Sequence, residues 1–163
     1  MSVSTPDNRG TEVARPDGRQ SPMAAAIARG AGRCLLAHGY ARLPEVPLAN
    51  GRRADLLAIH ENGDIWIVEI KSSLADFRAD QKWSEYREFC DRFIFAVASN
   101  FPIDELPAAT GIIIADRYGG ELVRPAPEHK LAPARRKAVI HRFARTAALR
   151  LHALADPEIG LEV

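Results

Sequence analysis

One pair of segments restricts the fold of this chain more than any other feature. Residues 54–60 and 65–71 are both strongly apolar, and residues 61–64, Glu-Asn-Gly-Asp, separate them. A short Asn-Gly connection between two such segments is typical of a β-hairpin. Both faces of each predicted strand carry apolar side chains, so the hairpin must lie inside a sheet that is covered on both sides. This pattern predicts a layered α/β fold.

Three charged residues interrupt the apolar pattern at the open end of the hairpin. Asp55 lies in the first strand, and Glu69 and Lys71 lie in the second. Because side chains alternate along a strand, Glu69 and Lys71 share one face. Charged groups inside a covered sheet are costly unless they bind something. These three residues are therefore the candidate site.

The length of the hairpin loop decides whether the two acids meet. A two-residue loop of Asn62 and Gly63 would put the carboxylates on opposite faces of the sheet. A three-residue loop over 61–63 needs a left-handed residue, which Gly63 provides. That loop puts Asp55 directly opposite Glu69 on the same face. We predict the three-residue loop.

Two facing carboxylates favour a divalent cation. Side chains opposite each other in an antiparallel pair lie about 5 Å apart, and carboxylates at that distance repel. A hard cation between them removes the repulsion, and carboxylate oxygens suit Mg²⁺ or Mn²⁺. Such an ion polarises a phosphate and activates water, while Lys71 stabilises developing negative charge. The alternative is structural, with Glu69 and Lys71 forming only an ion pair at the end of the sheet.

The other segments complete a single domain over residues 22–163. We predict helices over 22–39, 73–90 and 133–155, and strands over 42–48, 92–98, 111–115 and 121–124. Prolines in the strand at 42–48 favour an edge position. The last helix has a predicted core stripe of Ile140, Phe143, Ala147, Leu151 and Leu154. The order of elements predicts a mixed β-sheet flanked by helices.

Composition indicates where in the cell the protein is expected and in which state its cysteines are. Residues 1–21 are polar and rich in Gly, Pro and Ser, which predicts a disordered tail and no secretory signal. No segment is apolar enough to span a membrane, so we expect a cytoplasmic protein without a membrane partner. The only cysteines, Cys34 and Cys90, lack the spacing of metal ligands and are expected to be buried reduced thiols.

The charge distribution suggests a phosphate-binding surface around an acidic centre. Residues 22–54 hold five Arg and one Glu, residues 55–116 hold twelve acids and five bases, and residues 117–150 hold nine bases and two Glu. Basic segments around an acidic middle suit a cation site within a DNA-binding surface. Solvated helix faces would give the same pattern.

At these residues the sequence resembles the PD-(D/E)XK nuclease superfamily. Asp55 matches the first acid of the motif, and Glu69-Ile70-Lys71 matches its Glu-X-Lys signature. The resemblance implies a restriction-endonuclease-like core in which Asp55, Glu69 and the Ile70 carbonyl hold Mg²⁺ or Mn²⁺ and Lys71 is catalytic. Many members also carry an acid on the first helix. That helix has none here, so Glu45 is the candidate substitute.

A closer resemblance covers most of the chain from about residue 22 onward. The segments that carry it are 48–55, 65–73, 76–83, 115–119 and 134–138. They are similar to the MmcB-like family of bacterial DNA-repair proteins, whose nuclease role is inferred from motifs. The resemblance implies a metal-dependent DNA endonuclease that acts in repair.

Further candidates surround the motif. The resemblance to nucleases implies that Gln81 or Lys82, on the helix after the hairpin, contacts the scissile phosphate. Trp83 and Tyr86 are expected in the core rather than as base-stacking platforms. The candidate DNA-binding residues are the bases near the first acid and on the last helix: Arg52, Arg53, Arg135, Arg136, Lys137, Arg142 and Arg145.

Three functions remain open from the sequence. The first is a Mg²⁺-dependent DNA endonuclease, and the second is a DNA-binding module that does not cut and works within a repair complex. The third is an interaction protein whose hairpin charges form a salt bridge. The intact Asp, Glu and Lys set favours the first, and either a monomer or a homodimer fits the sequence.

Overall fold

The computed structural model describes residues 21–161. The helices are α1 (Pro22–Ala37), α2 (Leu74–Ala79) and α3 (Pro133–Ala155), with short 3₁₀ helices η1 (Trp83–Phe89), η2 (Ile103–Glu105) and η3 (Pro157–Ile159). The strands are β1 (Tyr40–Pro47), β2 (Arg53–His60), β3 (Ile65–Lys71), β4 (Arg92–Val97), β5 (Gly111–Ala115) and β6 (Gly120–Arg124). The predicted tail at residues 1–20 lies outside the described residues.

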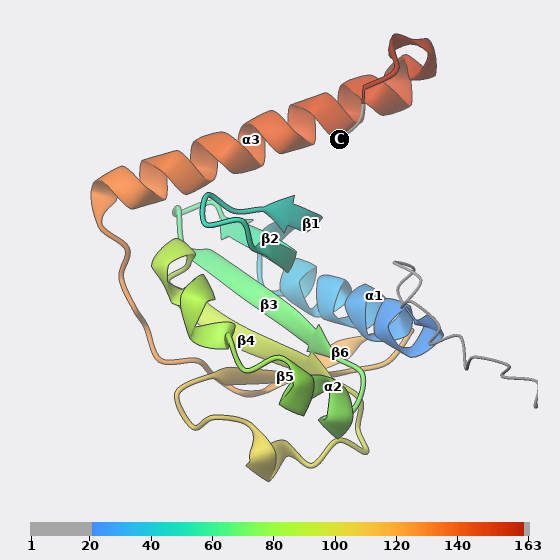
Figure 1. Cartoon of the computed structure of the whole chain (residues 1–163), viewed down its shortest axis with the longest axis vertical. Coiled ribbons are helices and arrows are strands. Elements are labelled where there is room, and N and C mark those ends of the chain that lie inside the picture. Colours follow the sequence, from blue (N-terminus) through green and yellow to red (C-terminus); the bar gives the residue numbers. More distant parts are fainter. Residues whose placement is uncertain (1–20, 162–163) are drawn as a thin grey trace, which may run out of the picture.

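The six strands form one mixed sheet in the order β1-β2-β3-β4-β5-β6 (Figure 1). The central strands β3, β4 and β5 run parallel, and the outer pairings are antiparallel. The predicted edge position of the proline-containing strand is confirmed, since β1 is at one end of the sheet. The open sheet with helices against it confirms the predicted fold class.

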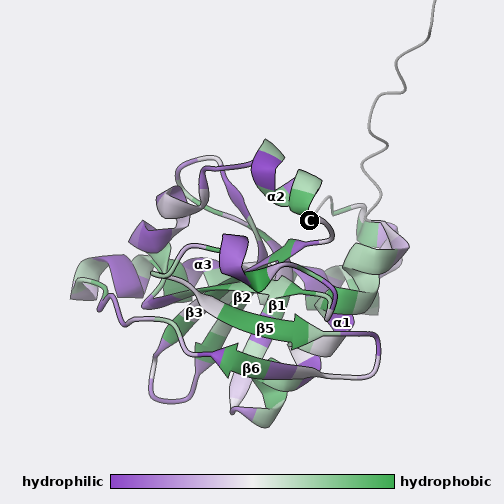
Figure 2. Ribbon diagram, turned by 90° about the horizontal axis from the view of Figure 1, so that it is seen from below, coloured by the Kyte–Doolittle hydropathy of each residue, from purple (hydrophilic) through white to green (hydrophobic). Residues whose placement is uncertain are grey.

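Helices cover both faces of the sheet. On one face α1 packs its buried residues Ile27, Ala31 and Leu35 on β2, β3 and β4. On the other face α3 and η1 lie over an aromatic core that includes Phe93 and Phe95. Figure 2 shows the hydrophobic residues concentrated on the strands between these layers. Ser21 precedes α1, and its side chain accepts a hydrogen bond from the amide of Ala24 and so caps the helix.

The predicted three-residue hairpin loop is confirmed. The amide of Gly63 donates to the His60 carbonyl, the amide of His60 donates to the Asp64 carbonyl, and both distances are 2.9 Å. Gly63 has a φ of +86°, the left-handed conformation that the loop requires. Further along the hairpin Leu56 pairs with Val68, so the same register brings the next residues, 55 and 69, opposite each other.

The single helix predicted over 73–90 is wrong. The chain forms α2, bends at residues 80–82, and continues as η1. The cause is Asp80, whose carboxylate accepts from the amide of Lys82 at 3.2 Å and so competes with the helical hydrogen bonds. Trp83 packs on Phe93 and Tyr86 is buried, which confirms their predicted place in the core.

The predicted core stripe of α3 is correct only in the first half of the helix. Ile140 and Phe143 pack against the core, but Leu151 is 67% exposed and Leu154 is 80% exposed. Figure 1 shows the reason: α3 continues past the edge of the sheet, where β1 ends the layer beneath it. Helical periodicity identifies an apolar face, but it does not show how far the sheet extends.

The remaining expectations concern the cysteines and membranes. Cys34 and Cys90 are buried free thiols, and burial raises the pKa of both. Within residues 21–161, no helix is both long enough and apolar enough to cross a membrane.

Candidate functional site

At the open end of the hairpin, the carboxylates of Asp55 and Glu69 each accept a hydrogen bond from the backbone of the facing strand. The Asp55 amide donates to Glu69 Oε1 at 3.0 Å, and the Ile70 amide donates to Asp55 Oδ2 at 2.8 Å. Glu69 is 5% exposed, and Asp55 is partly buried. Each carboxylate therefore has one oxygen fixed by the backbone of the facing strand. Among residues 21–161 no group donates a hydrogen bond to the second oxygen of either carboxylate.

Burial and nearby negative charge raise the pKa of both carboxyl groups. Burial raises the pKa of Asp55, and the nearby charge of Glu45 adds to this effect. Burial also raises the pKa of Glu69, and the charge of Asp55 raises it further. The backbone amides and Lys71 act in the opposite direction on both groups but do not overcome these effects. The pair therefore holds its protons more tightly than ordinary carboxyl groups do.

Lys71 stands beside the carboxylate pair on the same face of β3. It is 6% exposed, and its Nζ lies 3.7 Å from Asp80 Oδ2. Asp80 comes from the bend between α2 and η1, so the bend that interrupts the predicted helix supplies the partner of Lys71. A buried ammonium needs such a partner.

Glu45 extends the row of acids to a third strand. β1 pairs Pro44 with Leu56 and Val46 with Ala54, so Glu45 stands opposite Asp55. Its φ of +51° departs from strand geometry. Arg150 on α3 donates to the Glu45 carbonyl at 2.8 Å and holds this conformation. Residues at such strained positions cluster at functional sites. Glu45, the predicted additional site residue, therefore lies next to Asp55 in the sheet, and its role in the site stays a prediction.

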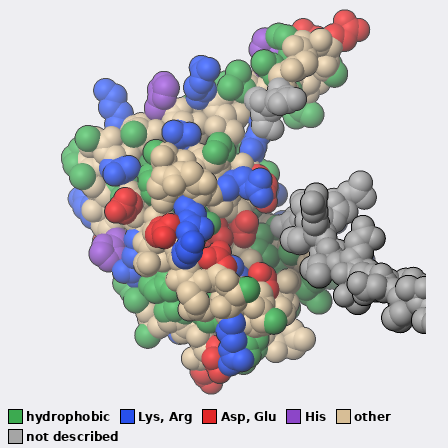
Figure 3. Space-filling view, viewed as in Figure 1, with side chains coloured by type: hydrophobic (Ala, Val, Ile, Leu, Met, Phe, Trp, Pro, Cys, Tyr) green, Lys and Arg blue, Asp and Glu red, His purple; other side chains and the backbone are tan. Residues whose placement is uncertain are grey.

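These acids line an open cleft with a volume of about 1000 Å³. Its walls also include Arg52, Arg53, Asp76 and Tyr86. Figure 3 shows acidic side chains gathered near the middle of this face of the molecule, with basic side chains around them. Asp76, Asp80 and Tyr86 line the cleft although they are not among the predicted site residues. Asp76 could have been found as the partner of the Ser73 cap, since its amide donates to Ser73 Oγ at 3.1 Å.

The donor set fits a magnesium-type ion held partly by water. In the described part of the chain, no three His, Cys, Asp or Glu side chains converge into a protein-only metal cage. Mg²⁺ does not need one, because it keeps several waters and binds through one or two carboxylates. Asp55, Glu69 and the Ile70 carbonyl are the groups that would hold it. The two carboxylate oxygens that the backbone leaves free are the ligands with the right chemistry.

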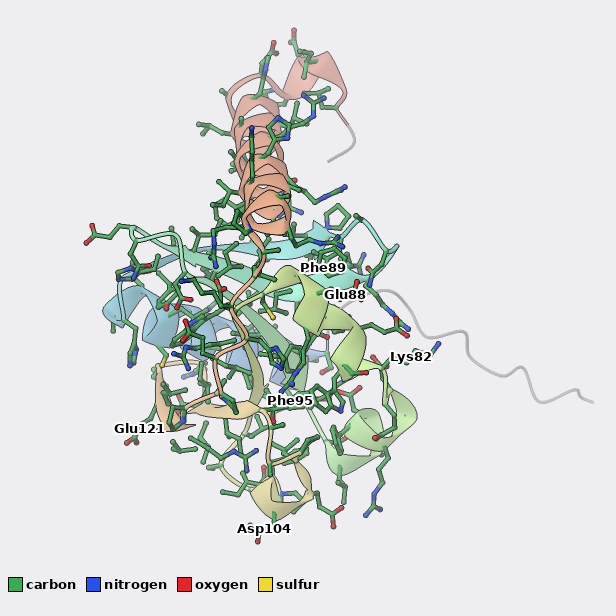
Figure 4. The ribbon with its side chains drawn as sticks, turned by 90° about the vertical axis from the view of Figure 1, so that its left-hand side faces the viewer. Lys82, Glu88, Phe89, Phe95, Asp104 and Glu121 are labelled. Atoms are coloured by element: carbon green, nitrogen blue, oxygen red, sulfur yellow. The ribbon has the colours of Figure 1, made fainter. Side chains whose placement is uncertain are left out.

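Gln81 and Lys82 do not line the cleft. Gln81 Nε2 donates to the Phe77 carbonyl at 3.0 Å and so closes the end of α2. Figure 4 shows Lys82 at the outer edge of the molecule. Asp80, which precedes them, is the residue of this segment that reaches the site.

The candidate DNA-binding residues fall into two groups. Four have contacts within the protein: Arg52 pairs with Glu85, Arg53 with Glu45, Arg136 with Asp91, and Arg135 stacks over the Phe89 ring. Lys137, Arg142 and Arg145 line a shallow groove along one side of α3. Arg136 donates to the buried Asp91 at 2.6 Å, which gives it a structural role. Lys137, Arg142 and Arg145 are therefore the candidate bases that the fold leaves available to phosphates.

Comparisons with known proteins agree with this architecture. The SPO1766 protein of unknown function from Silicibacter pomeroyi has a similar solved structure, with a TM-score of 0.81 and 50% sequence identity. The match covers 86% of this chain and 96% of that one. No curated protein matches the chain. The family model described as DNA repair protein MmcB-like matches residues 11–158, and so starts within the predicted tail. The chain belongs to the MmcB-like family of DNA repair proteins.

Proposed function

We propose that this protein is a metal-dependent DNA endonuclease that acts in DNA repair. The observation that carries the proposal is the pairing of Asp55 with Glu69 across the hairpin, with Lys71 on the same face. Two weakly acidic carboxylates and a buried ammonium at one cleft match the needs of phosphodiester hydrolysis. Membership of a DNA repair family supports DNA as the substrate.

Each residue of the site has a distinct role in this proposal. Asp55, Glu69 and the Ile70 carbonyl hold Mg²⁺ or Mn²⁺, which when bound polarises the phosphate and lowers the pKa of water. Lys71 stabilises the negative charge that develops on the phosphate. Its partner Asp80 lies 3.7 Å from the Lys71 Nζ and balances the charge of this buried ammonium at the cleft. Glu45 lies at the outer end of the acidic row and is the candidate for a second ion.

Nicking of supercoiled DNA tests the proposal directly. The purified protein should nick DNA when Mg²⁺ or Mn²⁺ is added and stay inactive with a chelator. Lys71→Ala should abolish nicking and retain most DNA binding, because one charge contributes little among many phosphate contacts. Lys82→Ala is the matched control, since Lys82 is a nearby lysine outside the cleft. Nicking that survives both Lys71→Ala and Asp55→Ala would contradict the proposal.

A DNA-binding module that does not cut is the second candidate function. It is favoured by the basic side of α3, where Lys137, Arg142 and Arg145 line a groove outside the cleft. Such a module would bind DNA through α3 and serve as a partner for other repair proteins. Calorimetry with Mn²⁺ separates the two functions. Metal binding that is lost in Asp55→Ala supports the nuclease, and DNA binding without metal binding or cutting supports the module.

A further inference from the structure

A second cavity lies directly beside the cleft. The parallel strands β3, β4 and β5 end at the same edge of the sheet, and the cleft lies at the end of β3. The cavity lies at the ends of β4 and β5, where Ser99, Asn100 and Asp116 line it. The start of α1 contributes to both, since Met23 lines the cavity and Ala24 lines the cleft. Two strand spacings amount to about 10 Å, so one polynucleotide strand can reach both.

The charge of this cavity differs from that of the cleft. Among the described residues that line it there is no Lys, Arg or His, and its acids are Asp116 and Glu121. Figure 4 shows Glu121 on the outer surface of the molecule. Without bases, the cavity does not suit a phosphate. The Ser99 hydroxyl and the Asn100 amide, beside an apolar floor that includes Ile27, suit a flat neutral group with hydrogen-bonding edges.

Tyr118 stands at this cavity as an exposed aromatic on a fixed turn. Its side chain is 67% exposed, and Arg117 covers one face of the ring at 4.6 Å. Its backbone is held on both sides: its amide donates to Asp116 Oδ1 at 2.7 Å, and its carbonyl accepts from Arg33 at 2.7 Å. A large aromatic side chain in solvent on a rigid turn needs an explanation, and the free face of the ring can stack on another planar group.

The packing beneath the turn also fixes its position. A Cβ atom at Gly30 of α1 would lie 2.0 Å from the Asp116 carbonyl oxygen, so the helix and the turn touch through their backbones. The Asp116 carboxylate accepts from the Gly119 amide at 3.0 Å and closes the turn from within. Tyr118 is therefore presented by a part of the molecule that does not need to order itself on binding.

We infer that this cavity, of about 850 Å³, binds an unpaired nucleobase of the strand whose phosphate enters the cleft. The base stacks on Tyr118, and Ser99 and Asn100 hydrogen-bond to its edge. This inference rests on the proposed function and deepens it by naming the substrate class. The substrate is DNA with a single-stranded segment next to the scissile phosphate. A cavity of this size is within the range that takes small ligands.

Binding measurements without divalent ions test the inference apart from cleavage. Fluorescence anisotropy compares a blunt duplex with the same duplex carrying a single-stranded overhang. We expect the DNA with the overhang to be bound about tenfold more tightly than the blunt duplex. This is the gain in affinity that stacking of one base on an aromatic side chain provides. Tyr118→Ala should remove this preference and Tyr118→Phe should keep it, while neither changes binding of the blunt duplex. The matched control is Leu36→Ala, which removes another exposed hydrophobic side chain. Leu36 lies on α1 outside the cavity and is 71% exposed.

A 2-aminopurine placed in the overhang gives an independent readout of stacking. Its fluorescence should be quenched by the wild type and by Tyr118→Phe, and not by Tyr118→Ala. Equal affinity for both DNAs, or a preference that survives Tyr118→Ala, would overturn the inference while leaving the nuclease proposal intact. Failure to bind either DNA would remove the proposed function as well.

Discussion

Arg136 and Asp91 form a bidentate ion pair in which each terminal guanidinium nitrogen lies 2.6 Å from a carboxylate oxygen. Asp91, which is 1% exposed, also accepts from the amides of Ile65 and Leu131. Arg136 reaches on to the Gly63 carbonyl in the hairpin loop at 2.7 Å. One ion pair thus joins the start of α3 to the loop whose geometry sets the register of Asp55 and Glu69.

Breaking this pair should destabilise the protein rather than weaken DNA binding alone. Arg136→Met leaves the Asp91 carboxylate buried without its charged partner, which costs about 3 kcal/mol or more of unfolding free energy. Urea unfolding measures the loss. Arg145→Met, at an exposed arginine on the same helix, should change stability by less than about 0.5 kcal/mol. Normal stability of Arg136→Met together with weaker DNA binding would return Arg136 to the DNA-binding surface.

The hairpin shows why part of the site could be predicted from sequence. Strand alternation and one glycine with a left-handed conformation are local properties, and together they place Asp55 opposite Glu69. The edge position of β1 followed from its prolines in the same way. The sequence was sufficient to predict a contact where a short loop determines which residues of two strands face each other.

The parts that could not be predicted depend on contacts between distant segments. Asp80 reaches Lys71 only because the chain bends after α2, and helical periodicity continues through that bend. Arg136 lay in a run of bases that resembles a DNA-binding surface, and only the fold shows its contact with Asp91. The exposure of Leu154 depends on where the sheet ends. The contact of Arg136 and the exposure of Leu154 leave no local signal in the sequence. The local hydrogen bond that bends the chain at Asp80 does not reveal that Lys71 is its partner.

Asp55→Asn should remove metal-dependent stabilisation without harming the metal-free fold. A cation that binds only the folded protein adds about 2.7 kcal/mol of stability at a concentration one hundred times its Kd. The variant loses a ligand, but it also loses a buried charge that repels Glu69. Thermal unfolding with and without Mn²⁺ should show a rise in Tm for the wild type only. An equal rise in the variant would place the bound ion elsewhere.

The raised pKa values of Asp55 and Glu69 predict how stability changes with pH. The folded state holds their protons more tightly than the unfolded state does, so their contribution is full below the ordinary carboxyl pKa. It is lost as pH rises from that value through the raised one. The Tm of the metal-free protein should therefore fall across this range. Glu69→Gln should flatten the fall, since the amide does not titrate.

The affinity for a metal ion should change with pH in the opposite direction to the Tm of the metal-free protein, because the ion competes with the protons of the pair. Affinity for Mn²⁺ should rise across the same pH range, and calorimetry in buffers of different ionisation enthalpy should detect protons released on binding. The matched control is Glu85→Gln, whose carboxylate lies outside the hairpin and pairs with Arg52. Binding with no proton release would show that the carboxylate pair is not the metal ligand.

Neutralising Lys137, Arg142 and Arg145 together should weaken DNA binding at low salt. These bases lie along one side of α3, and no ion pair joins them to an acid within residues 21–161. Each phosphate contact contributes about 0.9 to the slope of log affinity against log salt on duplex DNA, so the slope should fall by about 2.7. Anisotropy across a salt series measures it. The site is separate from this surface, so the triple variant should nick DNA as the wild type does once the protein concentration saturates the DNA. If the salt dependence of its affinity equals that of the wild type, this face of α3 does not contact DNA.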